Sequence, residues 1–178
     1  KMKQLFLVLI LLSLGCKEKR YHDQEQDNTV GPVTGALEDI MQFQKKMNME
    51  FKDPETSPLP DRYRKDFTTL DFYEPDTTYR IKAKFTRTPE ALPFMMPTTT
   101  ERQTEEVVFG IITFSLHGRT HKLEVYQNQE LMHQEKYRDY LFLPFADLTN
   151  GEETYGGGRY LDLTIPMGDT ILLDFNKA

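Results

Sequence analysis

The stretch Tyr79-Arg-Ile-Lys-Ala-Lys-Phe-Thr86 decides the fold class of this chain, because apolar and polar side chains alternate along it. A period of two places the apolar side chains on one face of an extended strand and the basic ones on the other. Shorter apolar runs follow at 107–116, 123–125, 141–145, 160–166 and 170–176. The sequence therefore predicts a mainly β (α+β) domain of about six short antiparallel strands, arranged as a β-sandwich or a small open barrel.

A long helix is predicted before the strands. Its apolar residues recur every three or four positions, at Ala36, Ile40, Phe43, Met47 and Phe51. Asp53-Pro54 ends this pattern, because the residue before a proline is disfavoured in a helix. We expect the helix to pack at one end of the strands, so that residues 36–178 form one β-rich domain.

The predicted turns set the connections between the strands. Gly118-Arg119 is a candidate two-residue hairpin turn, and Gly110 is a candidate β-bulge in the strand before it. Pro89–Pro97 is predicted to be a loop. We expect the last two strands to form a hairpin around Met167-Gly168-Asp169.

The register of this last hairpin decides which side chains share a face. With a three-residue loop, the apolar residues share the buried face: Leu161, Leu163, Ile165, Ile171, Leu173 and Phe175. Asp162 and Asp174 then lie close together on the opposite face, with Asn176. With a loop of two or four residues, Arg159 joins Asp174 and Asn176, but the apolar set is split. We favour the first register, because a slip of one residue would move the whole apolar set.

The N-terminal segment has the features of an export signal. Lys1 and Lys3 precede an apolar run that is too short to span a bilayer, and Gly15-Cys16 follows it. This ending resembles that of a bacterial lipoprotein signal, in which the cysteine is acylated and becomes the first residue of the mature protein. We expect a signal peptide at 1–15 and lipidation of Cys16, with a plain secretory signal as the alternative.

The segment 16–35 is polar and charged, so it cannot bury enough apolar surface to fold alone and is expected to be a flexible tether. The sequence therefore predicts that the protein is exported across the inner membrane and held in the bacterial cell envelope by an N-terminal lipid anchor.

The net charge of −6 makes nucleic acid an unsuitable partner, because an acidic chain repels the phosphate backbone.

Neither a metal nor a cofactor is expected from the remaining motifs. His117 and His121 flank a predicted turn, but the folded domain offers no sulfur donor, and a surface position explains them equally well. Gly156–Gly158 lacks the Lys-Ser/Thr pair of a phosphate-binding loop. Ser115 lies within a predicted strand rather than at a nucleophile elbow.

The segment Phe145–Arg159 concentrates polar side chains and glycines between two apolar strands. With the last residues of the chain, it supplies the candidate ligand-binding residues: Asp147, Thr149, Tyr155, Arg159, Asp174 and Asn176. Arg159 would bind an anionic group, because its guanidinium pairs with carboxylates in a bidentate geometry. The structural alternative is that Asp147, Tyr155 and Arg159 hold a long loop against the strands.

These residues also carry a resemblance to a known family. The pattern Phe145-x-Asp-x-Thr-x-Gly-x-x-Thr-Tyr-x-x-Gly-Arg-Tyr160, followed by Asp174-Phe-Asn176, resembles that of the bacterial family called domain of unknown function 1684. The resemblance covers roughly residues 43–178. Family members are secreted or lipid-anchored proteins of uncharacterised activity, and an Asn-Pro-x-Cys segment usually follows the Asp-Phe-Asn. The resemblance thus implies that the chain is truncated and that its site is completed beyond Ala178.

Two classes of function remain open. The first is a lipid-tethered binding or interaction module for an unknown small molecule or envelope protein. The second is a hydrolase-like enzyme that uses Asp147 or Asp174 as a base, with Tyr155 and Arg159. The enzyme hypothesis predicts a carboxyl group in a cleft whose pKa is strongly raised.

Overall fold

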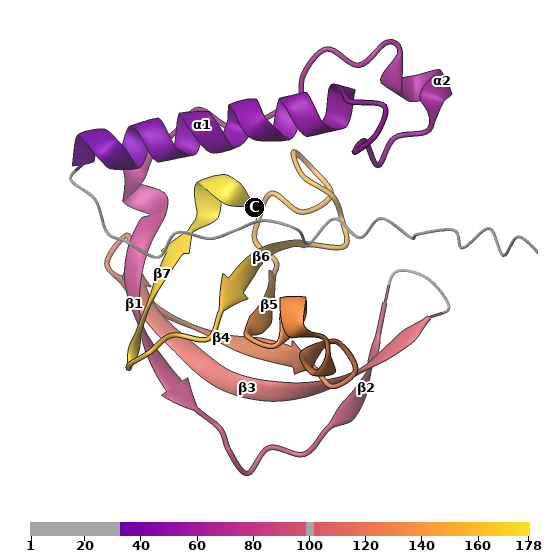
Figure 1. Ribbon diagram of the computed structural model, residues 1–178. Coiled ribbons are helices and arrows are strands. Elements are labelled where there is room, and N and C mark those ends of the chain that lie inside the picture. Colours follow the sequence, from indigo (N-terminus) through magenta and orange to yellow (C-terminus); the bar gives the residue numbers. More distant parts are fainter. Residues whose placement is uncertain (1–32, 99–101) are drawn as a thin grey trace, which may run out of the picture.

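The computed structural model describes residues 33–98 and 102–178 (Figure 1). The signal peptide predicted at 1–15, Cys16 and all but the end of the tether predicted at 16–35 lie outside the described residues. The elements are, in order, α1 (Val33–Lys52), α2 (Asp61–Arg64), η1 (Thr77–Tyr79), β1 (Arg80–Arg87), β2 (Phe94–Pro97), β3 (Gln103–Leu116), β4 (Arg119–Asn128), η2 (Leu131–His133), η3 (Glu135–Tyr137), β5 (Tyr140–Phe145), β6 (Arg159–Thr164), β7 (Thr170–Asp174) and η4 (Phe175–Lys177).

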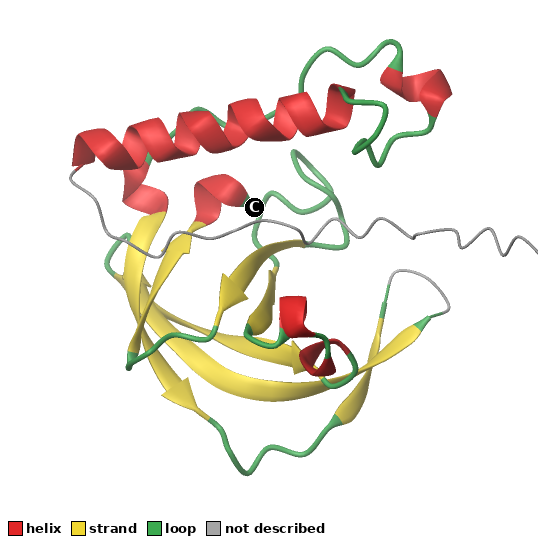
Figure 2. Cartoon of the chain, viewed as in Figure 1, coloured by secondary structure: helices red, strands yellow, loops and turns green. Residues whose placement is uncertain are grey.

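Six antiparallel strands form a nearly closed barrel in the order β6-β5-β4-β3-β1-β7, and β2 pairs with the first half of β3. Figure 2 shows the sheet curving around its own axis, with α1 lying across one end. The mainly β fold with an N-terminal helix is confirmed, and of the two predicted architectures the chain adopts the barrel.

The barrel is filled by the apolar side chains that alternate along its strands. Its buried core comprises Ala83, Phe85, Phe109, Ile112, Phe114, Val125, Leu141, Leu143, Leu161, Leu163, Ile171 and Leu173. Ile81, Ile165 and Phe175 pack at its margin. The inner-face assignment of both C-terminal strands is therefore confirmed.

The predicted pairing of those two strands is wrong. β6 pairs with β5 and β7 pairs with β1, so the two strands lie at opposite ends of the sheet order. Asp162 and Asp174 consequently do not share a polar face: Asp162 accepts a hydrogen bond from Tyr140 Oη at 2.7 Å, and Asp174 stands opposite Arg80. The alternation could not reveal this, because either pairing buries the same apolar residues.

The other differences are local. The loop predicted at Pro89–Pro97 contains β2. The tight turn is His117-Gly118, one residue earlier than predicted, and both residues have the positive φ that a type I′ turn requires (50° and 72°). The bulge at Gly110 is confirmed by the register shift there. A Cβ at Gly110 would lie 2.6 Å from the Phe85 ring, so the close approach of β1 requires glycine.

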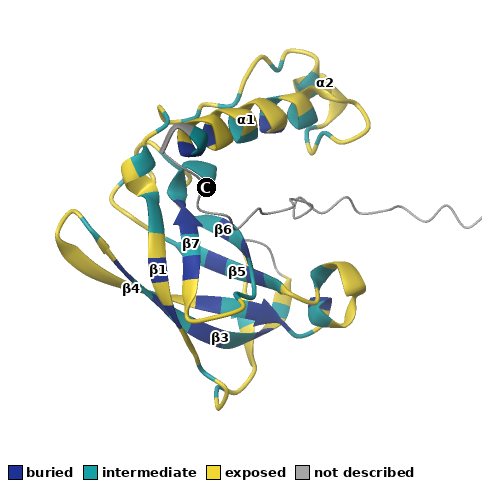
Figure 3. Cartoon of the chain, turned by 60° about the vertical axis from the view of Figure 1, so that its left-hand side comes forward, coloured by how far each residue is buried: buried dark blue, intermediate teal, exposed yellow. Residues whose placement is uncertain are grey.

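Helix α1 begins at Val33, three residues earlier than predicted. It buries Ala36, Ile40 and Met47, and its opposite face is exposed (Figure 3). Among the described residues, no helix is long and apolar enough to cross a membrane. Because α1 contacts η1 and η4, which stand at the ends of β1 and β7 nearest to it, it covers the end of the barrel where the chain terminates.

Candidate functional site

The loop of residues 146–158, between β5 and β6, is held by hydrogen bonds among its own residues. Asp147 Oδ1 accepts from the backbone N–H of Thr149 at 2.9 Å and from the Thr149 hydroxyl. The same hydroxyl lies 2.9 Å from Thr154 Oγ1. Asn150 Oδ1 accepts from the backbone N–H of Asp147 at 2.9 Å. The Asp-x-Thr-Asn segment is therefore a turn that its own side chains stabilise.

Arg159 begins β6 and closes this loop. Its Nη2 donates to Asp147 Oδ2 at 2.5 Å, as predicted. The guanidinium carbon lies 5.1 Å from the centre of the Phe145 ring and 5.8 Å from that of the Tyr73 ring. Its Nε is buried and has no hydrogen-bond partner among the described residues. The side chain is thus stacked between two aromatic rings, with part of its donor capacity unused.

The carboxyl group of Asp147 is ionised in this setting. Partial burial is the largest single effect and would raise its pKa, but the hydrogen bonds from Thr149 and the charge of Arg159 outweigh it. Together they hold the pKa of Asp147 below its usual value of 3.8. A catalytic base of the predicted enzyme would need the opposite shift.

The glycines of the loop have distinct roles. Gly158 has a φ of 95°, and a Cβ there would lie 2.7 Å from the carbonyl oxygen of Phe145. Only glycine fits this position without a movement of the backbone. Tyr155, predicted to belong to the site, is instead 66% exposed. Its ring lies against the backbone of Gly157, where a Cβ would come within 2.5 Å of it.

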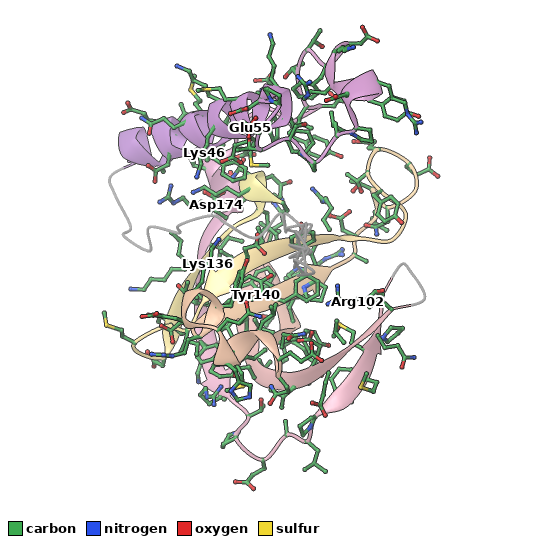
Figure 4. The ribbon with its side chains drawn as sticks, turned by 45° about the vertical axis from the view of Figure 1, so that its right-hand side comes forward. Lys46, Glu55, Arg102, Lys136, Tyr140 and Asp174 are labelled. Carbon is green, nitrogen blue, oxygen red and sulfur yellow. The ribbon has the colours of Figure 1, made fainter. Side chains whose placement is uncertain are left out.

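Asp174 and Asn176 belong to a second polar group, beneath α1. Asn176 Nδ2 donates to Asp174 Oδ1 at 2.8 Å and to the carbonyl of Asp76 at 2.9 Å, while Asn176 Oδ1 accepts from the Asp76 backbone N–H at 2.8 Å. Arg80 Nη1 lies 2.8 Å from Asp39 Oδ2 on α1 and 3.8 Å from Asp174 Oδ2. Figure 4 shows Asp174 below α1, next to the short helix that ends the chain. This group ties α1, η1 and η4 together.

The six predicted site residues therefore fall into two groups rather than one. Asp147, Thr149 and Arg159 form the first, and Asp174 and Asn176 form the second. The two are connected through apolar contacts: the Phe145 ring beneath Arg159 lies 5.1 Å from the ring of Phe175. Tyr155 belongs to neither group. The prediction that Arg159 reaches a carboxylate is met by Asp147.

Sequence reasoning missed one partner of the loop, Tyr73, and one of the helix, Arg80. Tyr73 donates from its hydroxyl to Glu153 Oε2 at 3.0 Å, and its ring covers Arg159. Arg80 carries the positive charge between Asp39 and Asp174. Its place in an alternating strand predicted a solvent-exposed side chain, yet that side chain is only 6% exposed. No pattern in the sequence distinguishes Arg80 from Lys82.

Glu106 on β3 is a further carboxyl group, and no pattern in the sequence singled it out. It is buried, accepts from Asn128 Nδ2 at 2.6 Å through Oε1, and has no partner for Oε2 among the described residues. Burial raises its pKa, and the hydrogen bonds from Asn128 and Thr104 offset only part of that effect. It belongs to neither of the two groups described above.

The described residues contain no cluster of His, Cys, Asp and Glu suited to a metal ion. A shallow hollow of about 400 Å³ lies on the outer side of α1, lined by Met41, Gln44, Lys45, Asn48, Met49, Lys52 and Thr68. None of the predicted site residues lines it. The 146–158 loop with Arg159 remains the place where polar chemistry and aromatic rings converge.

Comparison with known proteins agrees with the fold. No protein of curated function matches the chain. The solution NMR structure of an uncharacterized protein from gene locus rrnAC0354 of Haloarcula marismortui is similar to it, with a TM-score of 0.58 and 29% identity over 80% of this chain and 77% of that one. Residues 65–178 match the model of a family described as protein of unknown function (DUF1684). That match includes the whole barrel, both polar groups except Asp39, and the aromatic rings around Arg159, so the chain belongs to the DUF1684 family.

Proposed function

We propose that this protein is a binding module of the bacterial cell envelope, and that Arg159 recognises an anionic group of its ligand. The module is held at the membrane by a lipid on Cys16, after removal of the signal peptide at 1–15. The sequence features of the first sixteen residues support the anchor, and the 146–158 loop supports the binding site.

One observation carries the binding proposal. Arg159 has five N–H donors, and within the described residues its guanidinium donates one hydrogen bond, to Asp147. Its Nε–H is buried and unpaired, which costs free energy that an acceptor on a ligand would recover. The rings of Tyr73 and Phe145 lie 5.8 Å and 5.1 Å from the guanidinium carbon, and a guanidinium beside aromatic rings suits a planar carboxylate or a phosphate.

The hydrolase alternative has less support from the geometry. Its base would be Asp147, whose pKa is lowered, or Asp174, which is buried beneath α1 beside Arg80. Tyr155, its proposed hydrogen-bond donor, is largely exposed. A binding role requires none of these groups to transfer a proton.

The proposal is tested by following the Nε–H resonance of Arg159 in nitrogen-labelled protein during titration with acetate and, separately, with inorganic phosphate. We expect one of these anions to shift the resonance in a saturable way and Arg159→Lys to abolish binding at a nearly unchanged melting temperature. Arg119→Lys, at the exposed start of β4, is the matched control and should bind normally.

If neither anion shifts the resonance, or if Arg159→Lys lowers the melting temperature while no anion binds, then Asp147 and Arg159 serve only to hold the loop against the strands.

The anchor is tested separately, by incorporation of labelled palmitate into the full chain and into Cys16→Ser. Failure of the substitution to abolish incorporation would disprove lipidation of Cys16.

A further inference from the structure

The outer face of α1 carries a second feature that the binding site does not explain. Leu37, Met41 and Met49 are 42%, 57% and 63% exposed, although large apolar residues on a helix that packs against a barrel are expected to turn inward. Figure 3 shows this face directed away from the strands. An apolar face of this kind indicates a contact surface.

The same face is positively charged. Lys45 and Lys52 line the hollow beside Met41 and Met49, and no acidic residue lines it. Since the two lysines are seven residues apart, they stand on one side of the helix about 10 Å apart along its axis. Within the described residues neither forms an ion pair.

Of the acidic residues of α1, Glu38 stands beside Leu37 at the start of this face, and none lines the hollow. Glu38 accepts from Gln42 at 3.3 Å, and Glu50 pairs with Lys46 at 3.8 Å. Asp39 faces the barrel and binds Arg80. The protein has a net charge of −6, so a hollow lined by two lysines, two methionines and no acidic residue is a local departure from the character of the chain.

We propose that this face of α1, comprising Leu37, Met41, Lys45, Met49 and Lys52, docks on an anionic phospholipid surface. The methionines and Leu37 enter the boundary between headgroups and acyl chains, and the lysines bind lipid phosphates. This inference rests on the lipid anchor of the proposed function, because the anchor brings the face to the membrane.

The length of the chain makes the contact possible. Residues 17–32 separate Cys16 from the start of α1. Sixteen residues span at most about 55 Å when fully extended, so α1 stays within that distance of an acylated Cys16 and can reach the membrane surface. Beside the lipid anchor, an electrostatic contact adds to the binding energy and fixes the orientation of the domain on the membrane.

Docking of α1 would also set the orientation of the barrel on the membrane. Because α1 covers the end of the barrel where η4 terminates, docking places that end toward the lipid. The opposite end, where β7 begins and Met167 is fully exposed, then faces away from the membrane.

The test uses the chain from residue 16 onward with Cys16→Ser, which retains every described element and carries no lipid. Binding is measured by cosedimentation with phosphatidylglycerol–phosphatidylcholine vesicles and with pure phosphatidylcholine vesicles. We expect binding to the anionic vesicles only, weakened on the order of 30-fold by Lys45→Glu with Lys52→Glu. Lys82→Glu with Lys84→Glu, on the exposed face of β1, makes the same change of charge and should weaken it far less.

A second readout locates the contact. An environment-sensitive dye on Met41→Cys should shift to the blue on anionic vesicles, whereas the same dye on Met167→Cys should not. Equal shifts at both positions, equal loss of binding in both lysine pairs, or absence of binding to anionic vesicles would overturn the proposal. Because the tested chain carries no lipid, these outcomes leave the palmitate test of Cys16 as a separate result.

Discussion

The polar group of the 146–158 loop and the polar group beneath α1 use the same chemistry at different ranges along the chain. In the loop, Asp147 binds Thr149 two residues away and Arg159 twelve residues away. Beneath α1, Asn176 binds Asp76 across a separation of 100 residues, and Arg80 joins Asp39 to Asp174. The first group closes one loop, whereas the second holds the helix, β1 and β7 in place. The difference predicts that removing a polar side chain costs little stability in the loop group and more in the helix group.

The largest expected effect comes from Arg80→Ala. This change leaves Asp174, which is only 7% exposed, without its nearest positive charge, so we expect a loss of about 3–5 kcal/mol in the free energy of unfolding. Urea denaturation measures it. Arg64→Ala, which breaks the surface pair with Asp61, should cost under about 1 kcal/mol. A similar cost for both changes would show that the group beneath α1 contributes no more to stability than an exposed ion pair.

Asn176→Ala should have the next largest effect. It removes both hydrogen bonds to the Asp76 backbone and the one to Asp174, for a loss of about 2–3 kcal/mol. Hydrogen exchange would show faster opening of η1 together with η4. Lys177→Ala, at the neighbouring position, is the control and should leave exchange there unchanged.

Gly158→Ala should destabilise the loop group by about 2 kcal/mol, because the new Cβ meets the Phe145 carbonyl at a φ that alanine rarely adopts. Gly168→Ala has open space around the Cβ and an ordinary φ, so it should be nearly neutral. Thermal unfolding of the pair compares them directly. Equal melting temperatures would show that the loop backbone adjusts more easily than its contacts suggest.

Asp147→Asn should have the smallest effect, about 0.5–1 kcal/mol at neutral pH, since the side chain is 40% exposed and solvent screens its charge. The pKa of Asp147 is lowered in the folded protein, so the carboxylate contributes stability above its usual pKa of 3.8. That contribution is lost as the pH falls through the lower folded value. The stability difference between wild type and variant should therefore disappear below pH 3.8, and a constant difference across pH would contradict the assignment.

Much of the loop group could be predicted from the sequence. Asp147 and Arg159 were expected either to bind a ligand or to hold the loop against the strands, and in the structure they pair with each other. Their environment could not be predicted in the same way: Tyr73, whose ring covers Arg159, precedes β1 and reaches the loop only when the barrel forms. Tyr155, expected to belong with these residues, is 66% exposed and packs on Gly157, because proximity in sequence does not decide which way a loop side chain points.

The sequence by itself determined that strands with alternating apolar and polar side chains lie between residues 79 and 176. It also determined which of those side chains are buried, and that a helix precedes the strands. These are local properties, since periodicity depends on neighbours along the chain. Only the tertiary structure decided that β6 pairs with β5 and β7 with β1, and that Asp174 and Asn176 belong beneath α1 rather than with Arg159. Strand pairing joins residues far apart in sequence, and several pairings bury the same apolar surface. The choice among them therefore depends on how the whole barrel closes.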